Sequence, residues 1–219
     1  DVVETLKEFF LADLVNADGH SYDHMASTSR PETIRFLEKT PKNAIRIPFI
    51  LQAFPDARFI FLFRDARENI SSLLDSWRSG RFVTYPDLPG WPGEPPWSHL
   101  LIPGWQRLAG KSLAQIVASQ WAITNQVIMS DLRQLPAERW CAIEYHSFLS
   151  NTENELRRLC YFAQVVFGPR MREVGSMPLK PSKYTLSAPQ ADKWRKIAAE
   201  LDTVVPSTEK LMAALRELV

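Results

Sequence analysis

The sequence lacks several features that would assign it to a common class of protein. Its two cysteines, Cys141 and Cys160, are too few for a disulfide framework and do not have the spacing of metal ligands. No apolar run approaches the length of a membrane span, and the N-terminus has no signal-peptide pattern. With 26 basic and 25 acidic residues, the net charge of +1 gives no reason to expect a nucleic acid or membrane partner. We expect a cytoplasmic protein with reduced cysteines.

What the chain does contain is enough apolar surface for a sizeable core. Apolar residues make up 45% of the 219 positions, and we expect a single domain over residues 1–219. The sequence shows no cluster of carboxylates and no spaced set of histidines and cysteines, so we expect no metal. With a balanced net charge, any binding of an anion must come from a local group of cations.

One stretch, residues 59–74, predicts a strand followed at once by a helix. The uninterrupted apolar run from Phe59 to Phe63 is typical of a strand buried on both faces of a parallel sheet. Asp65 and Glu68 then have the spacing of a capping box, and helical apolar periodicity follows. A helix N-terminus at the carboxyl end of a parallel strand suits phosphate, and Arg64 lies at that point. We therefore predict an anion site at Arg64.

A second unit with the same order precedes it in the chain. Residues 34–39 read as a short strand that ends at Lys39, and Pro41 is well placed to open the next helix. A crossover of this length should be right-handed and should set the two strands parallel and close. The sequence therefore predicts an α/β fold, a parallel sheet flanked by helices, with Lys39 and Arg64 at strand ends.

The segment 81–110 differs in composition from the rest, because it is rich in proline and tryptophan. It cannot continue a helix or a central strand, and we interpret it as an insertion or lid. Two interpretations stay open. Its tryptophans could pack on one another in a compact loop, or they could form a wall that binds an acceptor.

Further elements are expected along the rest of the chain. Residues 2–15 show helical periodicity, Ser112 can cap a long helix, and residues 139–145 read as a strand. Thr152 and Glu155 have the spacing of another capping box. After an irregular basic segment at 177–189, a helix begins near Lys193, and the last helix covers about 207–219.

These residues resemble a known family. Lys39-Thr-Pro, Phe54-Pro-Asp-Ala-Arg-Phe-Ile and Arg64-Asp-Ala-Arg-Glu-Asn-Ile-Ser-Ser are similar to segments of the sulfotransferases that use 3′-phosphoadenosine 5′-phosphosulfate (PAPS), particularly the branch resembling protein-tyrosine sulfotransferases. The similarity extends from about Phe36 to Trp194. It implies a fold like that of P-loop nucleoside triphosphate hydrolases, and transfer of a sulfuryl group from PAPS to a hydroxyl acceptor.

The resemblance also implies roles for individual residues. Arg64 and Ser72 would hold the 3′-phosphate, which suits a guanidinium and a hydroxyl donor. Lys39 would be catalytic, because sulfuryl transfer, like phosphoryl transfer, depends on neutralising the leaving-group oxygen. The remaining cofactor-binding residues would be those that line the nucleotide pocket or close over it: Tyr145, Ser182, Lys183, Lys193 and Trp194.

The chain departs from the family pattern in two places. It has no Pro-x-x-Gly-Thr-Thr turn to hold the 5′-phosphosulfate, so either the first strand lies upstream of this sequence or the site is degenerate. Because Lys39, Arg64 and Ser72 are all present, we favour the first explanation. The strand end that usually reads Tyr-Glu-Asp is Tyr145-His146-Ser147 here, which leaves no acid at that place.

The general base and the acceptor stay open. Glu38, His99 and His146 are candidates for the base. The acceptor could be a small molecule, a carrier-bound chain or a protein tyrosine. Two other functions remain: a non-catalytic nucleotide-binding or interaction module, and a P-loop kinase, which ranks last because Gly-Lys-Ser/Thr is absent.

Overall fold

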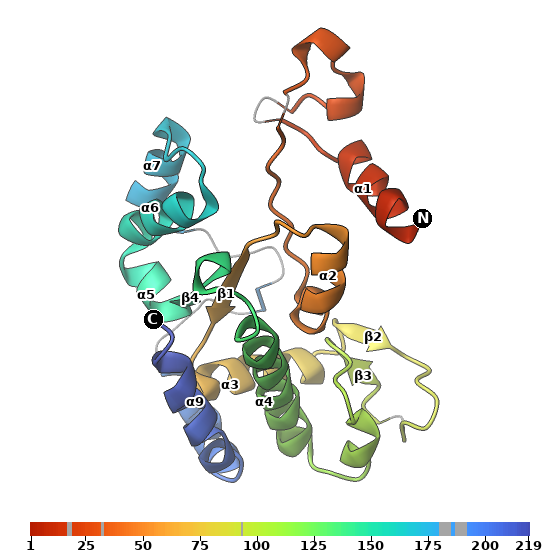
Figure 1. Cartoon of the computed structure of the whole chain (residues 1–219). Coiled ribbons are helices and arrows are strands. Elements are labelled where there is room, and N and C mark those ends of the chain that lie inside the picture. The colour runs from red at the N-terminus through yellow and green to blue at the C-terminus, as the bar shows by residue number, and fades with distance from the viewer. Residues whose placement is uncertain (17–18, 32, 93, 180–184, 187–191) are drawn as a thin grey trace. The chain divides into compact units, whose positions relative to one another are not determined.

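The computed structural model describes residues 1–16, 19–31, 33–92, 94–179, 185–186 and 192–219. Contacts within the chain divide it into two compact units, residues 1–57 and residues 58–219, which are drawn in Figure 1 and described separately below. The expectation of a single domain stays a prediction.

The unit 1–57 is built from helices around a small group of aromatic rings. Helix α1 (Val2–Ala12) begins at Asp1, whose carboxylate accepts a hydrogen bond from the backbone N–H of Val3 at 3.0 Å. The rings of Phe10, Phe36 and Phe54 pack against one another with centroids 5.3 to 5.8 Å apart. The other elements of this unit are η1 (Tyr22–His24), η2 (Ser27–Ser29), η3 (Pro41–Ile45) and α2 (Ile47–Ala53).

The strand predicted at 34–39 is wrong, and the crossover built on it is wrong as well. Residues 34–39 have no regular secondary structure, and no partner strand pairs with them among the described residues. Phe36, which lies within the predicted strand, contributes its ring to the aromatic group instead. The expected helix does follow, since Pro41 opens η3 and α2 comes directly after it.

The unit 58–219 contains the predicted parallel pair of strands. β1 (Phe59–Phe63) pairs in parallel with β4 (Trp140–Glu144), in a register that joins Phe63 to Glu144. Helices flank the pair (Figure 1), which confirms the predicted α/β fold class. Because the two strands end level with each other, the residues that follow them, Arg64 and Tyr145, meet at one edge of the sheet.

Burial along β1 is one-sided rather than two-sided. Phe61 and Phe63 are buried, whereas Ile60 and Leu62, on the other face, are 36% and 52% exposed. The expectation of a strand buried on both faces is therefore wrong for β1 in the described structure. An uninterrupted apolar run predicts the strand but cannot by itself show what packs against each face.

Two long helices form the centre of this unit. Helix α3 (Ala66–Arg78) packs against α4 (Leu113–Leu132), which begins at Ser112, the cap that the sequence predicted, and has a capping box there. In that box the backbone N–H of Gln115 donates to the Ser112 hydroxyl, and the side-chain oxygen of Gln115 accepts from the backbone N–H of Ser112. The C-terminal segment packs on α3 and α4 through η6 (Lys193–Ile197), α8 (Ala198–Leu201) and η7 (Val205–Thr208), and ends in α9 (Glu209–Arg216).

Three helices follow β4: α5 (Tyr145–Ser150), α6 (Thr152–Ala163) and α7 (Pro169–Ser176). A short turn, η5 (Ala137–Arg139), precedes the strand. The capping box expected at Thr152 and Glu155 is wrong, because α6 starts after Asn151 and has no side-chain cap. The Thr152 hydroxyl instead donates to the carbonyl of Phe148 at 2.9 Å, so it serves the preceding helix.

The segment 81–110 forms a hairpin and an aromatic cluster. β2 (Val83–Tyr85) pairs antiparallel with β3 (Trp97–Ser98), and η4 (Trp105–Leu108) follows. The rings of Trp91, Trp97 and Trp105 pack on one another with centroids 4.9 to 6.3 Å apart, and Trp97 also packs on Trp77 of α3. This packing agrees with the interpretation as a compact loop, and a role in binding an acceptor stays a prediction.

Membrane-spanning helices and metal-binding groups are both absent from the part of the chain that the structure describes. The described residues contain no helix long and apolar enough to cross a membrane. They also contain no group of three or more His, Cys, Asp and Glu side chains placed to hold a metal ion.

Candidate anion-binding site

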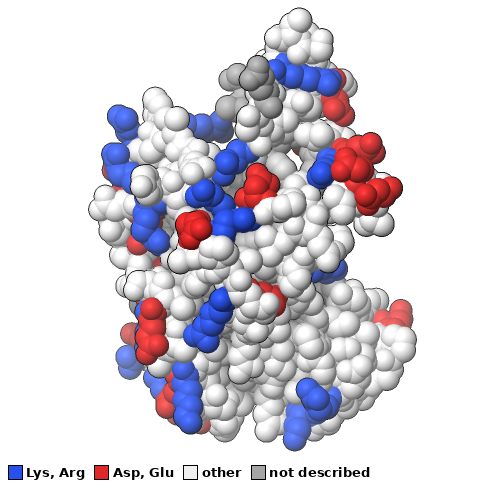
Figure 2. Space-filling model, viewed as in Figure 1, with Lys and Arg blue, Asp and Glu red and all other residues white. Residues whose placement is uncertain are grey.

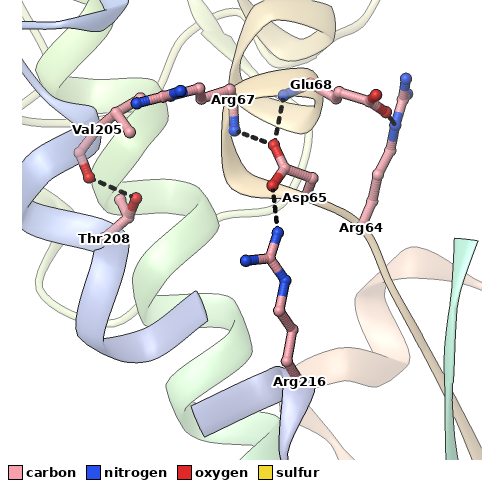
Figure 3. Close-up of polar contacts among 7 residues, drawn as sticks. All are labelled: Arg64, Asp65, Arg67, Glu68, Val205, Thr208 and Arg216. Carbon is pink, nitrogen blue, oxygen red and sulfur yellow. Dashed lines mark hydrogen bonds and ion pairs between the residues drawn. The ribbon is translucent and has the colours of Figure 1, made fainter. Parts of the chain in front are cut away.

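The candidate site begins where β1 meets α3. Asp65 is the N-cap of α3, and its Oδ1 accepts hydrogen bonds from the backbone N–H groups of Arg67 at 3.0 Å and Glu68 at 3.4 Å. The predicted capping box is thus half formed, because the Glu68 carboxylate does not return to Asp65 (Figure 3). It accepts a hydrogen bond from Arg64 Nε at 2.9 Å instead.

Arg64 is fixed on two sides. Besides the Glu68 contact at Nε, its guanidinium carbon lies 5.0 Å from the centroid of the Tyr145 ring. Tyr145 is there because it begins α5 directly after β4, whose last residue pairs with the last residue of β1. The arginine side chain is 28% exposed, so it is neither a solvated surface charge nor a buried one.

Ser72 lies on the same side of α3 as Glu68, since residues four apart on a helix are neighbours. Ser72 is exposed, whereas Ser71 is buried, which agrees with the choice of Ser72 as the ligand-facing hydroxyl. Asp75, three residues further, continues this side of the helix. These side chains form a stripe that starts at the Arg64 guanidinium and continues with the Glu68 carboxylate, the Ser72 hydroxyl and the Asp75 carboxylate.

The C-terminal candidates contact the same helix but are engaged with other side chains. Lys193 forms an ion pair with Asp75. The ring of Trp194 lies 5.2 Å from the guanidinium carbon of Arg67. This contact gives Arg67 an aromatic partner. Ser182 and Lys183 lie outside the described residues.

Lys39 belongs to the other unit of the chain. It is exposed, and it follows Glu38, whose carboxylate accepts a hydrogen bond from the Asn43 side chain. Five of the candidate residues lie around α3: Arg64, Ser72, Tyr145, Lys193 and Trp194. Lys39 lies in the separate unit 1–57, so its catalytic role stays a prediction.

Two further candidates for the base, His99 and His146, have different surroundings. His99 is tied to α3, with its Nε2 2.7 Å from the Ser76 hydroxyl and its ring stacked on Phe82. Burial lowers the pKa of His99, so it is neutral near pH 7. His146 is exposed on α5.

Two acidic side chains and one arginine around α3 were not singled out from the sequence. Glu68 was assigned only to the capping box, although its position four residues after Arg64 is the spacing of a helical ion pair. The Asp65–Arg216 ion pair, at 3.0 Å, joins residues 151 positions apart, and no local signal could have found it (Figure 3). Asp75 was likewise missed as the partner of Lys193.

The charges on the surface are mixed, and a hollow in the described structure lies away from the candidate residues. Figure 2 shows basic and acidic side chains interspersed over the face in view, in keeping with a local anion site. This hollow of about 460 Å³ is lined by residues 149, 150, 152 and 175–179. None of the candidate residues contributes to it.

The first part of the chain is similar to a known protein family. A model of the sulfotransferase family matches residues 6–89, a range that includes Lys39, Arg64 and Ser72. The resemblance to the sulfotransferases is confirmed. No curated protein matches the chain.

Two solved structures are similar to this sulfotransferase-like chain. The sulfotransferase domain from the curacin biosynthetic pathway is 20% identical, with a TM-score of 0.43 over 75% of this chain and 61% of that one. The sulfotransferase STF9 from Mycobacterium avium is 19% identical, with a TM-score of 0.48 over 78% of this chain and 40% of that one. The chain therefore spans less than two thirds of the length of either protein.

Proposed function

We propose that this protein is a sulfotransferase that takes the sulfuryl group from PAPS and transfers it to a hydroxyl acceptor. The observation that carries the proposal is the arrangement at the start of α3. There, a partly exposed arginine follows a parallel strand, and an exposed serine lies on the same side of the helix. The match of the sulfotransferase family to residues 6–89 supports it.

The residues around α3 fit the 3′-phosphate end of PAPS. Among the described residues, the Arg64 guanidinium contacts Glu68 through Nε and the Tyr145 ring through one face. It makes no hydrogen bond there through Nη1 or Nη2. Two guanidinium N–H groups side by side match two oxygens of a phosphate, and the Ser72 hydroxyl can donate a further hydrogen bond. When bound, PAPS supplies a sulfuryl group on a good leaving group, so no metal is required of the protein for that purpose.

Lys39 would act at the other end of the nucleotide. In sulfuryl transfer the bond from sulfur to the leaving phosphate oxygen breaks, a bond to the acceptor oxygen forms, and the hydroxyl proton leaves to a base. An ammonium group can neutralise the charge that develops on the leaving oxygen, and such an interaction favours turnover over binding. This assignment follows from the family resemblance at Lys39-Thr40-Pro41.

The different roles proposed for Arg64 and Lys39 can be tested by substituting each residue. Arg64→Ala should weaken binding of 3′-phosphoadenosine 5′-phosphate by about 10-fold or more, because a charge-assisted phosphate contact is lost. Lys39→Ala should change this affinity by less than about 3-fold while lowering the rate of PAPS turnover by about 100-fold or more. Isothermal titration calorimetry measures the first effect, and PAPS conversion with a panel of phenols and alcohols measures the second.

A matched control lies on the same helix. Arg78 of α3 pairs with Glu200 rather than with the candidate site, and Arg78→Ala should leave nucleotide affinity unchanged. If the native protein bound AMP as tightly as 3′-phosphoadenosine 5′-phosphate, a site for a 3′-phosphate would be contradicted.

A further inference from the structure

The inference concerns Glu68, to which the proposed function gives no task. Its carboxylate is the only hydrogen-bonding partner of the Arg64 side chain among the described residues. A carboxylate beside an anion site can act in one of two ways. It can compete with the ligand for the arginine, or it can hold the arginine in the orientation that the ligand needs.

The geometry of the contact separates these two roles. A competitor would occupy the Nη1 and Nη2 edge, where a carboxylate can accept two parallel hydrogen bonds from a guanidinium. Glu68 instead accepts one hydrogen bond, from Nε, at 2.9 Å. Tyr145 covers a face of the same guanidinium at 5.0 Å. With Nε and a face engaged, the edge that carries Nη1 and Nη2 is left for a ligand.

The backbone of Glu68 is held in place by the N-cap of α3. Asp65 Oδ1 accepts from the Glu68 backbone N–H, which fixes the first turn of the helix on which the Glu68 side chain stands. Asp65 Oδ2 is occupied by Arg216 at 3.0 Å. Glu68 therefore pairs with Arg64, and Asp65 pairs with Arg216 (Figure 3). Because both oxygens of Asp65 are engaged, Asp65 does not replace Glu68 as the partner of Arg64.

We propose that Glu68 is a positioning residue that orients the Arg64 guanidinium for a phosphate dianion, rather than a charge that competes with the dianion. Holding the side chain before the ligand arrives lowers the loss of conformational freedom on binding. The proposal rests on the proposed function for the identity of the ligand, but the orientation of Arg64 is a property of the free protein.

Two substitutions distinguish positioning from competition. Glu68→Gln retains an oxygen that can accept from Nε but removes the charge, whereas Glu68→Ala removes both. If Glu68 positions Arg64, Glu68→Ala weakens binding of 3′-phosphoadenosine 5′-phosphate by about 10-fold and Glu68→Gln stays within about 3-fold of the native protein. If Glu68 competes, both variants bind more tightly, which would overturn the proposal, as would an unchanged affinity in Glu68→Ala.

A control for folding is present on another helix. Glu153 of α6 forms an ion pair with Arg157, four residues later, and accepts hydrogen bonds from both Nε and Nη2 of that arginine. Glu153→Ala removes an ion pair of α6 rather than of α3 and should leave nucleotide affinity unchanged. Thermal unfolding of Glu68→Ala and Glu153→Ala should show losses of similar size, so a difference in affinity between them reports on Arg64 rather than on the stability of the protein.

A measurement without ligand separates this inference from the proposed function. In ¹⁵N-labelled protein, the Arg64 Nε–H signal, assigned by its absence in Arg64→Lys, should exchange slowly with water and exchange faster in Glu68→Ala. If the native protein fails to bind the nucleotide, the proposed function fails, yet slow exchange that depends on Glu68 would still support the positioning. Equal exchange in the native protein and Glu68→Ala would overturn the positioning, whatever the nucleotide result.

Discussion

At the scale of single residues, His99 joins the segment 81–110 to α3. Its Nε2 lies 2.7 Å from the hydroxyl of Ser76, which is itself buried, and its backbone φ of 62° is unusual for a residue other than glycine. The ring stacks on Phe82, and the backbone N–H donates to the Phe82 carbonyl at 3.1 Å. This constrained environment suits the neutral form of the imidazole.

The stability of the protein should therefore fall as the pH drops through the titration of His99. Burial lowers the pKa of His99 in the folded protein below its ordinary 6.5, so the unfolded chain binds the proton first. The contribution is present above the unfolded pKa of about 6.5 and is lost progressively as the pH falls from there towards the lower pKa of the folded state. Urea unfolding at a series of pH values measures this loss.

The control for this prediction is His99→Asn, because asparagine tolerates a positive φ and does not titrate. The variant should show a flatter dependence of the unfolding free energy on pH between about 7.5 and 5.5. An equal slope in the native protein and the variant would assign the acid sensitivity to other groups.

The candidate residues differ in how well the sequence predicted their environment. The position of Arg64 at the end of a parallel strand follows from local sequence, because the apolar run and the N-cap at Asp65 are both adjacent to it. The contact of Arg64 with Tyr145 depends on the pairing of β1 with β4, which sequence periodicity does not show. The ion pair of Lys193 with Asp75 joins residues 118 positions apart and depends on how the C-terminal segment packs on α3.

At the scale of elements, the first turn of α3 combines two stabilising contacts in one side chain. Asp65 satisfies the backbone N–H groups of Arg67 and Glu68 with Oδ1, and it pairs with Arg216 of α9 through Oδ2. The N-cap is local, whereas the ion pair joins the start of α3 to α9. The Arg216 side chain is 56% exposed, so its contribution is expected to be the smaller one.

Substitution of Asp65 should separate the two contacts. Asp65→Ala removes the cap and should lower the free energy of unfolding by about 1 kcal/mol. Asp65→Asn retains a capping oxygen and loses the partly exposed ion pair with Arg216, so the loss should be below about 0.5 kcal/mol. Urea unfolding of both variants tests this, with Ser112→Ala, a cap of α4 without an ion pair, as the comparison. Equal losses in Asp65→Ala and Asp65→Asn would show that the ion pair dominates.

The elements that the sequence predicted correctly have strong local signals. The helix after Ser112 is an example, since the residue at the cap and Gln115 complete a capping box that is visible in the sequence. The strand expected at 34–39 was predicted from only six residues, and a strand needs a partner strand that such a short pattern cannot identify. Thr152 failed as a cap for a similar reason, because a hydroxyl near a helix start can equally serve the end of the preceding helix.

At the scale of the whole molecule, the two units differ in how much apolar surface they bury. Among the described residues of 1–57, the buried apolar side chains are Ile47 and Ala53, whereas 58–219 includes large buried side chains such as Ile70, Trp77 and Trp121. Helix α1 has no buried side chain, although Phe10 packs its ring on Phe36 and Phe54. Since burial of apolar surface is the dominant favourable term, the smaller unit should be the less stable one.

Native-state hydrogen exchange followed by mass spectrometry should resolve this difference. Backbone amides that open locally exchange at a rate set by the stability of their own region, so peptides from α1 should show protection on the order of 100-fold lower than peptides from α4. Peptides from β1 and α3 serve as the internal comparison, because both contain buried side chains such as Phe61 and Leu74. Equal protection in α1 and α4 would mean that residues 1–57 and 58–219 unfold as one cooperative unit. Unequal protection would place Lys39 in a unit that can open while the Arg64 site stays folded.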